Sequence, residues 1–399
     1  MTLSISTSWW SIEPLGWFAE EKLLGAALQG KVHRVPLSLY VNKSAWYAHQ
    51  SRFAAENPGL IPVVKGNGYG FTLPVLAQAA ALLGVGAGVD QVAVGTAQEA
   101  RVVLENCPHD VIVLEPFLSA ANEYAMPERV IHTAGSVAAI RRLVGHRMLV
   151  ECRSSLHRQG VPRESLHEVR RALGAWRPEG FSLHLPIDRP ADVDPMRQVA
   201  DWMSALAQAG LDVPTMYVSH LTQREMGTLA ARFPDTRFRL RVGTNLWLGE
   251  RAAIEARATV LDAIPVARGE RIGYRQNRVQ HGGWIVVVSG GTFQGVGLEA
   301  PRMHHGLPPR IREVAESGVR AMNRILSPFW WQGRRRWFAE PPHMSVSMIR
   351  LPLSAEPPQS GSELLARVSY TRTHFDRVVL LEDFEARSTS VTDSLQLGA

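Results

Sequence analysis

The chain has 399 residues, and its 43 basic and 37 acidic side chains give a formal net charge of +6 at pH 7. This length allows one large domain and a smaller one, and a hydrophobic share of 45% is enough to bury a sizeable core. No segment approaches the roughly 20 consecutive apolar residues of a membrane span, and we expect no secretory signal. The modest basic excess lacks the dense basic face of a nucleic-acid-binding protein, so we expect neither nucleic acid nor membrane as a partner.

Two cysteines, Cys107 and Cys152, provide neither a disulfide framework nor a metal-binding cluster. Both fit a reducing compartment, so the composition predicts a cytoplasmic protein without a bound metal.

Residues 1–35 form an N-terminal extension to which the sequence gives no role. From Leu37 onward, short apolar runs alternate with helical stretches, which is typical of parallel βαβ units. The runs are Leu37–Asn42, Leu60–Lys65, Gln91–Gly95, Val111–Glu115, Arg129–Thr133, Met148–Cys152, Phe181–Leu185, Met216–His220 and Phe238–Gly243. Without the first run, eight strands remain, the number that closes a (β/α)₈ barrel. The pattern therefore predicts an α/β fold with a TIM barrel over residues 36–250.

After Glu250 the runs read as strands divided by glycine-rich turns, with no regular helices between them. This predicts a mostly β domain over residues 251–399, including a C-terminal tail rich in serine and threonine.

Lys65 ends the first predicted barrel strand, directly before a turn that contains three glycines. Burial lowers the pKa of a lysine, and a neutral amine is what Schiff-base chemistry on a carbonyl requires. The glycines would let the backbone approach a ligand closely. The alternative is an exposed lysine before an ordinary loop, and this stretch by itself favours that alternative.

Further polar residues fall at the ends of other predicted strands, where a barrel gathers its chemistry. They are Glu151, His157, Arg158, His184, Ser219, His220, Thr222, Arg241, Gly243 and Thr244. Each of them alone has a structural explanation, such as a satisfied core histidine or a surface arginine. Their agreement in position, with a phosphate-type turn after the last strand, is what indicates a site.

These motifs resemble those of the alanine racemase family, fold-type III enzymes that use pyridoxal 5′-phosphate. Val63-Val-Lys-Gly-Asn-Gly-Tyr-Gly70 resembles the family's Val-Val-Lys-Ala-Asn-Ala-Tyr-Gly, and Ser154-Ser-Leu-His-Arg-Gln-Gly160 is similar to Thr-Gly-Met-His-Arg-Leu-Gly. Arg241-Val-Gly-Thr-Asn-Leu-Trp-Leu-Gly249 resembles Arg-Pro-Gly-Ile-Ala-Leu-Tyr-Gly. The likeness extends from about Leu37 to about Glu382, and several motifs resemble a divergent branch of the family.

The resemblance implies a role for each matching residue. Lys65 would hold the cofactor as an internal aldimine and act as one of two bases, and Arg158 would support the cofactor hydroxyl and the substrate carboxylate. Arg241 would face the pyridine nitrogen, which discourages ring protonation and favours racemisation over elimination or transamination. The other implied cofactor contacts are Tyr69, His184, Thr222, Gly243 and Thr244, and the implied substrate contacts are Arg158, Glu151 and Met344.

Two departures from the family concern the chemistry directly. The family's second base is a tyrosine contributed by the partner subunit, but the aligned position here is Arg278, which is a poor base. His281 is the nearest group with a useful pKa, and Tyr274 is the other alternative. Glu151 stands where the family commonly has a carbamylated lysine, so we expect its carboxylate to orient Arg158 by an ion pair.

The sequence thus predicts a pyridoxal-phosphate-dependent isomerase, an alanine-racemase-like enzyme that interconverts the L- and D-forms of a small amino acid. The resemblance implies a homodimer with shared active sites. Two alternatives remain open: another pyridoxal-phosphate reaction, such as decarboxylation or retro-aldol cleavage, or a protein that binds the cofactor without turnover.

Overall fold

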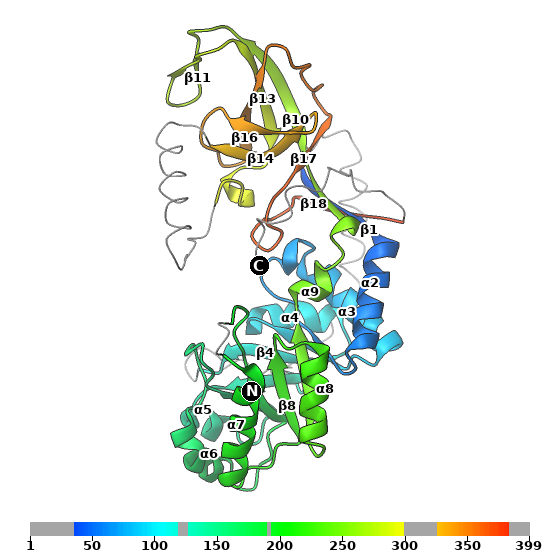
Figure 1. Cartoon of the computed structure of the whole chain (residues 1–399), viewed down its shortest axis with the longest axis vertical. Coiled ribbons are helices and arrows are strands. Elements are labelled where there is room, and N and C mark those ends of the chain that lie inside the picture. Colours follow the sequence, from blue (N-terminus) through cyan, green and yellow to red (C-terminus); the bar gives the residue numbers. More distant parts are fainter. Residues whose placement is uncertain (1–35, 119–126, 190–192, 299–324, 383–399) are drawn as a thin grey trace, which may run out of the picture. The chain divides into compact units, whose positions relative to one another are not determined.

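The computed structural model describes residues 36–118, 127–189, 193–298 and 325–382 (Figure 1). One sheet contains eight parallel strands in the order β2-β9-β8-β7-β6-β5-β4-β3. They are β2 (Ile61–Pro62), β3 (Gln91–Val94), β4 (Asp110–Pro116), β5 (Val130–Ala134), β6 (Met148–Cys152), β7 (Gly180–Leu183), β8 (Thr215–Ser219) and β9 (Arg237–Val242). A parallel bridge between Val63 and Ala93 joins the two ends of this order. The predicted (β/α)₈ barrel is therefore confirmed.

Helices accompany these strands, and several of them begin at a residue whose side chain caps the first turn. The helices are α2 (Lys43–Glu56), α3 (Leu73–Ala87), α4 (Ala97–Asn106), α5 (Val137–Leu143), α6 (Leu166–Leu173), α7 (Pro195–Gln208), α8 (Gln223–Arg232) and the single turn α9 (Thr244–Trp247). Helices α4 and α8 each start with a reciprocal capping box, formed by Thr96 with Glu99 and by Thr222 with Glu225. Such boxes satisfy first-turn amides and fix where the helix begins relative to the strand before it.

Apolar side chains fill the inside of the barrel. A cluster of strand residues packs there, consisting of Ile61, Val63, Ala93, Ile112, Ile131, Leu149 and Tyr217, with Leu114 against it. Outside the ring, helices bury one stripe each; on α6 the buried residues are Leu166, Val169 and Leu173, at helical spacing. The filled interior leaves the strand ends as the place where polar groups can gather.

The second sheet also has eight strands, in the order β13-β16-β15-β14-β17-β10-β1-β18. They are β1 (Leu37–Asn42), β10 (Ile254–Val266), β13 (Gly283–Ser289), β14 (Leu326–Trp331), β15 (Arg334–Phe338), β16 (Val346–Pro352), β17 (Glu363–Ala366) and β18 (Arg377–Leu381). A separate two-stranded sheet pairs β11 (Arg271–Ile272) with β12 (Asn277–Arg278). Apart from the parallel pair β1–β18, the second sheet is antiparallel, so the predicted mostly β domain is confirmed.

Strand β1 lies in this second sheet, although the sequence analysis assigned residues 36–250 to the barrel domain. It pairs antiparallel with β10 and parallel with β18. The sequence analysis left this run out of the eight barrel strands but did not predict the sheet that it joins, because a strand's neighbours depend on contacts far away in the sequence.

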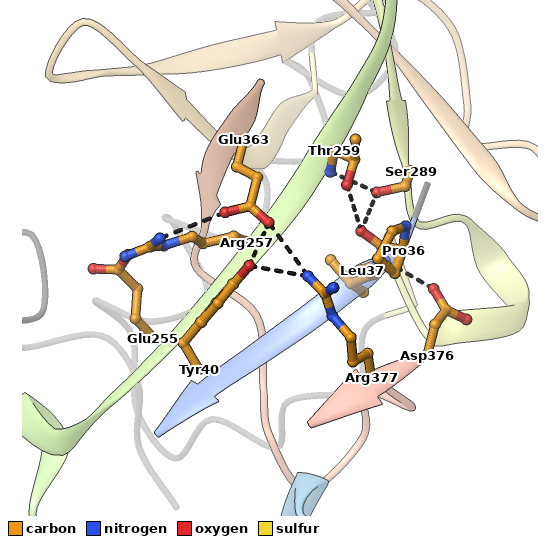
Figure 2. Close-up of polar contacts among 10 residues, drawn as sticks. All are labelled: Pro36, Leu37, Tyr40, Glu255, Arg257, Thr259, Ser289, Glu363, Asp376 and Arg377. Carbon is orange, nitrogen blue, oxygen red and sulfur yellow. Dashed lines mark hydrogen bonds and ion pairs between the residues drawn. The ribbon is translucent and has the colours of Figure 1, made fainter. Parts of the chain in front are cut away.

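Polar side chains join β1 to β10, β17 and β18, three strands that lie far from it in the sequence (Figure 2). We call Tyr40, Glu255, Arg257, Glu363 and Arg377 the seam cluster. The Tyr40 hydroxyl donates to Glu363 Oε1 at 2.7 Å and accepts from Arg377 Nη2 at 3.0 Å. Arg257 donates from Nε to Glu255 at 2.5 Å and from Nη1 to Glu363 at 3.4 Å. Opposite charges therefore meet throughout the seam cluster, which links β1, β10, β17 and β18.

Two negative findings hold for the described part of the chain. It contains no group of three or more histidine, cysteine, aspartate or glutamate side chains that could hold a metal ion. Nor do its helices include one that is long and apolar enough to cross a membrane. The N-terminal extension and the tail after residue 382 lie outside the described residues.

Candidate active site

A cavity of about 370 Å³ opens at the carboxyl ends of the barrel strands. Of the residues predicted for the site, it is lined by Lys65, Tyr69, Glu151, Arg158, His184, Arg241, Gly243 and Thr244. Ser219 and His220, also noted in the sequence at strand ends, line it too. The structure therefore gathers most of the predicted residues in one place.

The turn after Lys65 is held by a carboxylate from the next βα unit. Glu99 Oε1 accepts the backbone N–H of Gly66 at 2.7 Å, and its Oε2 accepts those of Gly95 at 2.6 Å and Thr96 at 3.0 Å. Gly66 has φ +62, in the left-handed region that favours glycine. Glu99 thus ties the lysine turn to the start of α4 and fixes the direction in which Lys65 leaves its strand.

The Lys65 amine has a pKa below its ordinary value. Burial among the strand ends is the main cause, the cations Arg158 and Arg241 lower the pKa further, and Glu99 opposes them. The side chain still reaches solvent through the open cavity. Lys65 is therefore an accessible amine whose pKa is lowered by its surroundings.

Tyr69 is buried against the turn that follows β9. A Cβ on Gly243 would lie 2.0 Å from the Tyr69 hydroxyl oxygen, so this close approach requires glycine. The turn is itself anchored, because the Trp247 indole donates to the Val63 carbonyl at 2.8 Å, two residues before Lys65. Burial, with a smaller contribution from Glu99, raises the pKa of Tyr69, so its hydroxyl remains a hydrogen-bond donor.

Arg241 and Glu151 form a buried, loosely paired couple at the bottom of the site. Arg241 Nη1 lies 3.9 Å from Glu151 Oε2, and both side chains are almost fully buried. Among the described residues, Arg241 Nη2 has no hydrogen-bond partner. The prediction that Glu151 orients Arg158 was wrong: Glu151 and Arg241 both point inward from strand ends, whereas Arg158 lies on an exposed loop.

Two histidines occupy the side of the cavity formed by β7 and β8. His184 Nδ1 lies 2.9 Å from Ser219 Oγ, which also accepts the backbone N–H of Leu185 at 3.0 Å. His220 presents its ring to His184 edge-on, with the centroids 5.2 Å apart. Burial and the nearby Arg241 lower the pKa of His184 to about 3, so this ring is neutral at physiological pH.

Four predicted site residues do not line this chain's cavity. The Thr222 hydroxyl instead takes part in the capping box of α8 with Glu225. Arg278, on β12, and His281 are exposed on the second domain, and Met344 is also exposed. A role for the last three in the site of a second chain stays a prediction. Tyr274 likewise lies outside, 84% exposed, with its ring 4.5 Å from that of His343.

The sequence analysis missed the contribution of a late loop. Thr371 lines the cavity, although it lies far from the barrel in the sequence. Asn67 holds this loop, because its Nδ2 donates to the carbonyls of Tyr370 at 2.8 Å and Thr373 at 2.7 Å. Asn67 lies inside the lysine motif and could have been noticed, whereas nothing local marks Thr371.

Comparisons with known proteins agree with this geometry. Residues 45–231 match the family model described as alanine racemase, N-terminal domain. The sequence matches none of the curated proteins with which it was compared.

Solved structures are similar to the chain in fold. The biosynthetic alanine racemase from Pseudomonas aeruginosa is 20% identical with a TM-score of 0.59, over 84% of this chain and 91% of that one. The alanine racemase from Corynebacterium glutamicum is 19% identical with a TM-score of 0.60, over 86% and 98%. The histidine racemase from Leuconostoc mesenteroides is 15% identical with a TM-score of 0.58, over 88% and 98%. Residues 45–231, the part of the chain that matches the alanine racemase N-terminal domain, include Lys65, Arg158 and His184.

Proposed function

We propose that the protein is a pyridoxal-5′-phosphate-dependent racemase, alanine-racemase-like, that interconverts the L- and D-forms of a small amino acid. One observation carries this proposal: the Lys65 amine and Arg241 line the same cavity. A buried guanidinium nitrogen of Arg241 has no hydrogen-bond partner among the described residues. A buried donor without an acceptor is costly, so it indicates a ligand that supplies one.

The residues present fit the cofactor. Lys65 would hold its aldehyde carbon, the Tyr69 hydroxyl and the turn at Gly243 would hold its phosphate, and Arg241 would face its ring nitrogen. When bound, pyridoxal phosphate withdraws electrons from the amino acid and acidifies its Cα–H bond.

The charges of the cavity suit anions. Arg158 and Arg241 both line it, and within the described residues only Arg241 has an ion-pair partner, Glu151 at 3.9 Å. A cleft with excess positive charge attracts a phosphate and the carboxylate of an amino acid. Arg158, exposed at the cavity, is positioned to orient the substrate carboxylate, while the neutral form of Lys65 can accept a proton at Nζ.

One observation favours a second candidate function. Racemisation by two bases needs a proton-transferring group on each face of Cα, yet Arg278, His281 and Tyr274 all lie outside this chain's cavity. Decarboxylation or retro-aldol cleavage needs only one well-placed proton donor, and Lys65 alone could supply it. Binding of the cofactor without turnover is the remaining alternative.

Absorbance and chirality test these functions. The purified protein should show an absorbance band of bound pyridoxal phosphate that is lost in Lys65→Ala. With L-alanine and other small amino acids in D₂O, a racemase incorporates deuterium at Cα and yields the D-form on a chiral column. Release of carbon dioxide or an aldehyde would favour the second candidate, and a wild type without the band would refute cofactor binding altogether.

We also propose that the protein works as a homodimer. In that arrangement the exposed Arg278, His281 and Met344 of one chain could approach the cavity of the other. Light scattering measures the mass in solution directly. A monomer that is active at all concentrations would contradict the shared site. The cytoplasmic location stays a prediction.

A further inference from the structure

We propose that His220 is the second acid–base group of the site, transferring a Cα proton on the side of the substrate away from Lys65. This inference rests on the proposed racemase function and deepens it, because it places both groups in one chain. With His220 in this role, the site would need no tyrosine from a partner subunit as its second base.

The order of the strands separates the two groups. Lys65 follows β2, His220 directly follows β8, and β9 lies between these strands in the ring. The buried Arg241 near the end of β9 therefore has Lys65 on one flank and His220 on the other. The amine and the imidazole thus line one cavity from strands on either side of Arg241, and we assign them to opposite faces of Cα, as inversion requires.

The backbone at His220 is held in an unusual conformation. Its φ is +57, in the left-handed region that residues other than glycine rarely adopt. The residue before it, Ser219, is fixed on both sides, by the N–H of Leu185 and by the ring of His184. Such strain persists where the surrounding structure enforces it, and it is concentrated at functional sites. Here it directs an imidazole into the cavity.

The surroundings of His220 favour the neutral ring. The charged and titratable groups that act on it are Arg189, Arg241 and Lys65, and His184 packs against its ring. Arg189 is paired with Glu225 at 3.1 Å, which compensates part of its charge. Together with burial, the three cations lower the pKa of His220. A neutral imidazole can accept a proton from carbon and return it.

The other titratable groups that line the cavity have different tasks. His184 is bound to Ser219, Tyr69 lies against Gly243, and Glu151 is buried beside Arg241. Among the described lining residues that could move a proton at neutral pH, His220, like Lys65, has neither a hydrogen bond nor an ion pair. Its ring is thus available to substrate.

The proposed proton transfers balance when both groups exchange protons with solvent. In one direction His220 takes the proton as a Cα–H bond breaks, and the electron pair stays with the substrate. The Lys65 amine, protonated at the start of this direction, gives its proton to the opposite face, which forms the new Cα–H bond. The amino acid keeps its atoms and inverts its configuration. Solvent then takes the proton from His220 and returns one to Lys65 before the next turnover in the same direction.

The first test measures position rather than activity. Diethyl pyrocarbonate modifies neutral, accessible imidazoles, and mass spectrometry of peptides locates the adducts. We expect loading with pyridoxal phosphate to reduce modification of His220 severalfold and to leave His167, exposed on α6, unchanged. Equal modification of His220 before and after loading, in protein that shows the cofactor band, would overturn the inference.

The second test uses His220→Asn, because asparagine tolerates the left-handed backbone and cannot act as the base. We expect the cofactor band to remain, racemisation to fall by about 100-fold or more, and deuterium exchange to persist from one enantiomer only. His220→Gln should behave the same way, and the matched control His167→Gln should racemise like the wild type. Racemisation by His220→Asn at the wild-type rate refutes this assignment. A wild type without the band or without racemisation refutes the proposed function.

Discussion

The seam cluster and the barrel cavity both contain several charged side chains, but these are paired in the seam cluster and largely unpaired in the cavity. In the seam cluster, Glu363 receives the Tyr40 hydroxyl and lies 3.4 Å from Arg257 and 3.7 Å from Arg377. In the cavity, neither Lys65 nor Arg158 has an ion pair within the described residues, and one nitrogen of Arg241 is left without a partner. Paired charges hold strands together, whereas unpaired charges in a cleft are available to bind a ligand of opposite charge.

The contrast has an energetic consequence. Burial and, to a smaller extent, the like charges of Arg158 and Arg241 lower the pKa of Lys65 and so disfavour its charged form. The folded, cofactor-free protein gains little from these groups. Substitutions in the cavity should therefore reduce function without reducing stability, and substitutions in the seam cluster should do the opposite.

The largest expected effect is the loss of activity in Lys65→Met. Methionine keeps much of the side-chain volume but removes the amine, so cofactor binding and racemisation should disappear. The free energy of unfolding of the cofactor-free protein should change by no more than about 0.5 kcal/mol, because no ion pair is broken. Urea unfolding and a chiral assay measure the two effects, and Lys43→Ala, which breaks only an exposed pair with Glu382, is the control for activity. A marked loss of stability in Lys65→Met would remove the contrast between the two regions.

Glu363→Ala should show the reverse. It leaves Tyr40, Arg257 and Arg377 without their shared acceptor, and we expect a cost of about 2 kcal/mol in the free energy of unfolding. The bound cofactor's absorbance band should remain.

The matched control for Glu363→Ala is Glu382→Ala. Glu382 pairs with Lys43 at an exposed site, where an ion pair contributes about 0.5 kcal/mol or less. If the two variants lost equal stability, the seam cluster would be no more than a set of surface pairs.

The same contrast explains what the sequence could predict. The alternation of apolar runs with helical stretches shows where strands end. Lys65 and Arg241 could therefore be placed at the carboxyl ends of the barrel strands before any contact was known. Two contacts could not be predicted, because they depend on groups that meet across the fold: Glu151 pairs with Arg241 rather than Arg158, and β1 joins the second sheet. Thr371 lies at the cavity in a late loop that Asn67 holds through the carbonyls of Tyr370 and Thr373, and nothing in the sequence near Thr371 indicates this contact.

Gly243→Ala tests the fine geometry of the cavity. The added methyl would overlap the Tyr69 hydroxyl, which must move away from the turn after β9. Loss of one hydrogen bond to a charged phosphate corresponds to about a tenfold weaker affinity for pyridoxal phosphate. Titration of the cofactor followed by absorbance gives the dissociation constant.

Tyr69→Phe supplies the comparison for Gly243→Ala. It removes the hydroxyl without crowding the turn, and it should weaken cofactor binding by a similar factor. Adding Gly243→Ala to it should then weaken binding less than in the wild-type background, because the clash is partly relieved. Full additivity would mean that Tyr69 and Gly243 act separately.

A further prediction concerns the dependence of stability on pH. The pKa of His184 falls from 6.5 to about 3 on folding, mainly through burial and Arg241. Between these pH values the unfolded chain binds a proton at His184 that the folded chain does not. The free energy of unfolding is therefore unaffected by His184 above pH 6.5 and decreases as the pH falls from 6.5 toward 3. Urea unfolding at pH 7, 5.5 and 4.5 should show this decline, and His184→Gln should flatten it. His167→Gln, on an exposed face of α6, should leave the slope unchanged. An equal slope in His184→Gln and wild type would mean that His184 is protonated in the folded protein, and the cavity would then tolerate one more positive charge than its geometry implies.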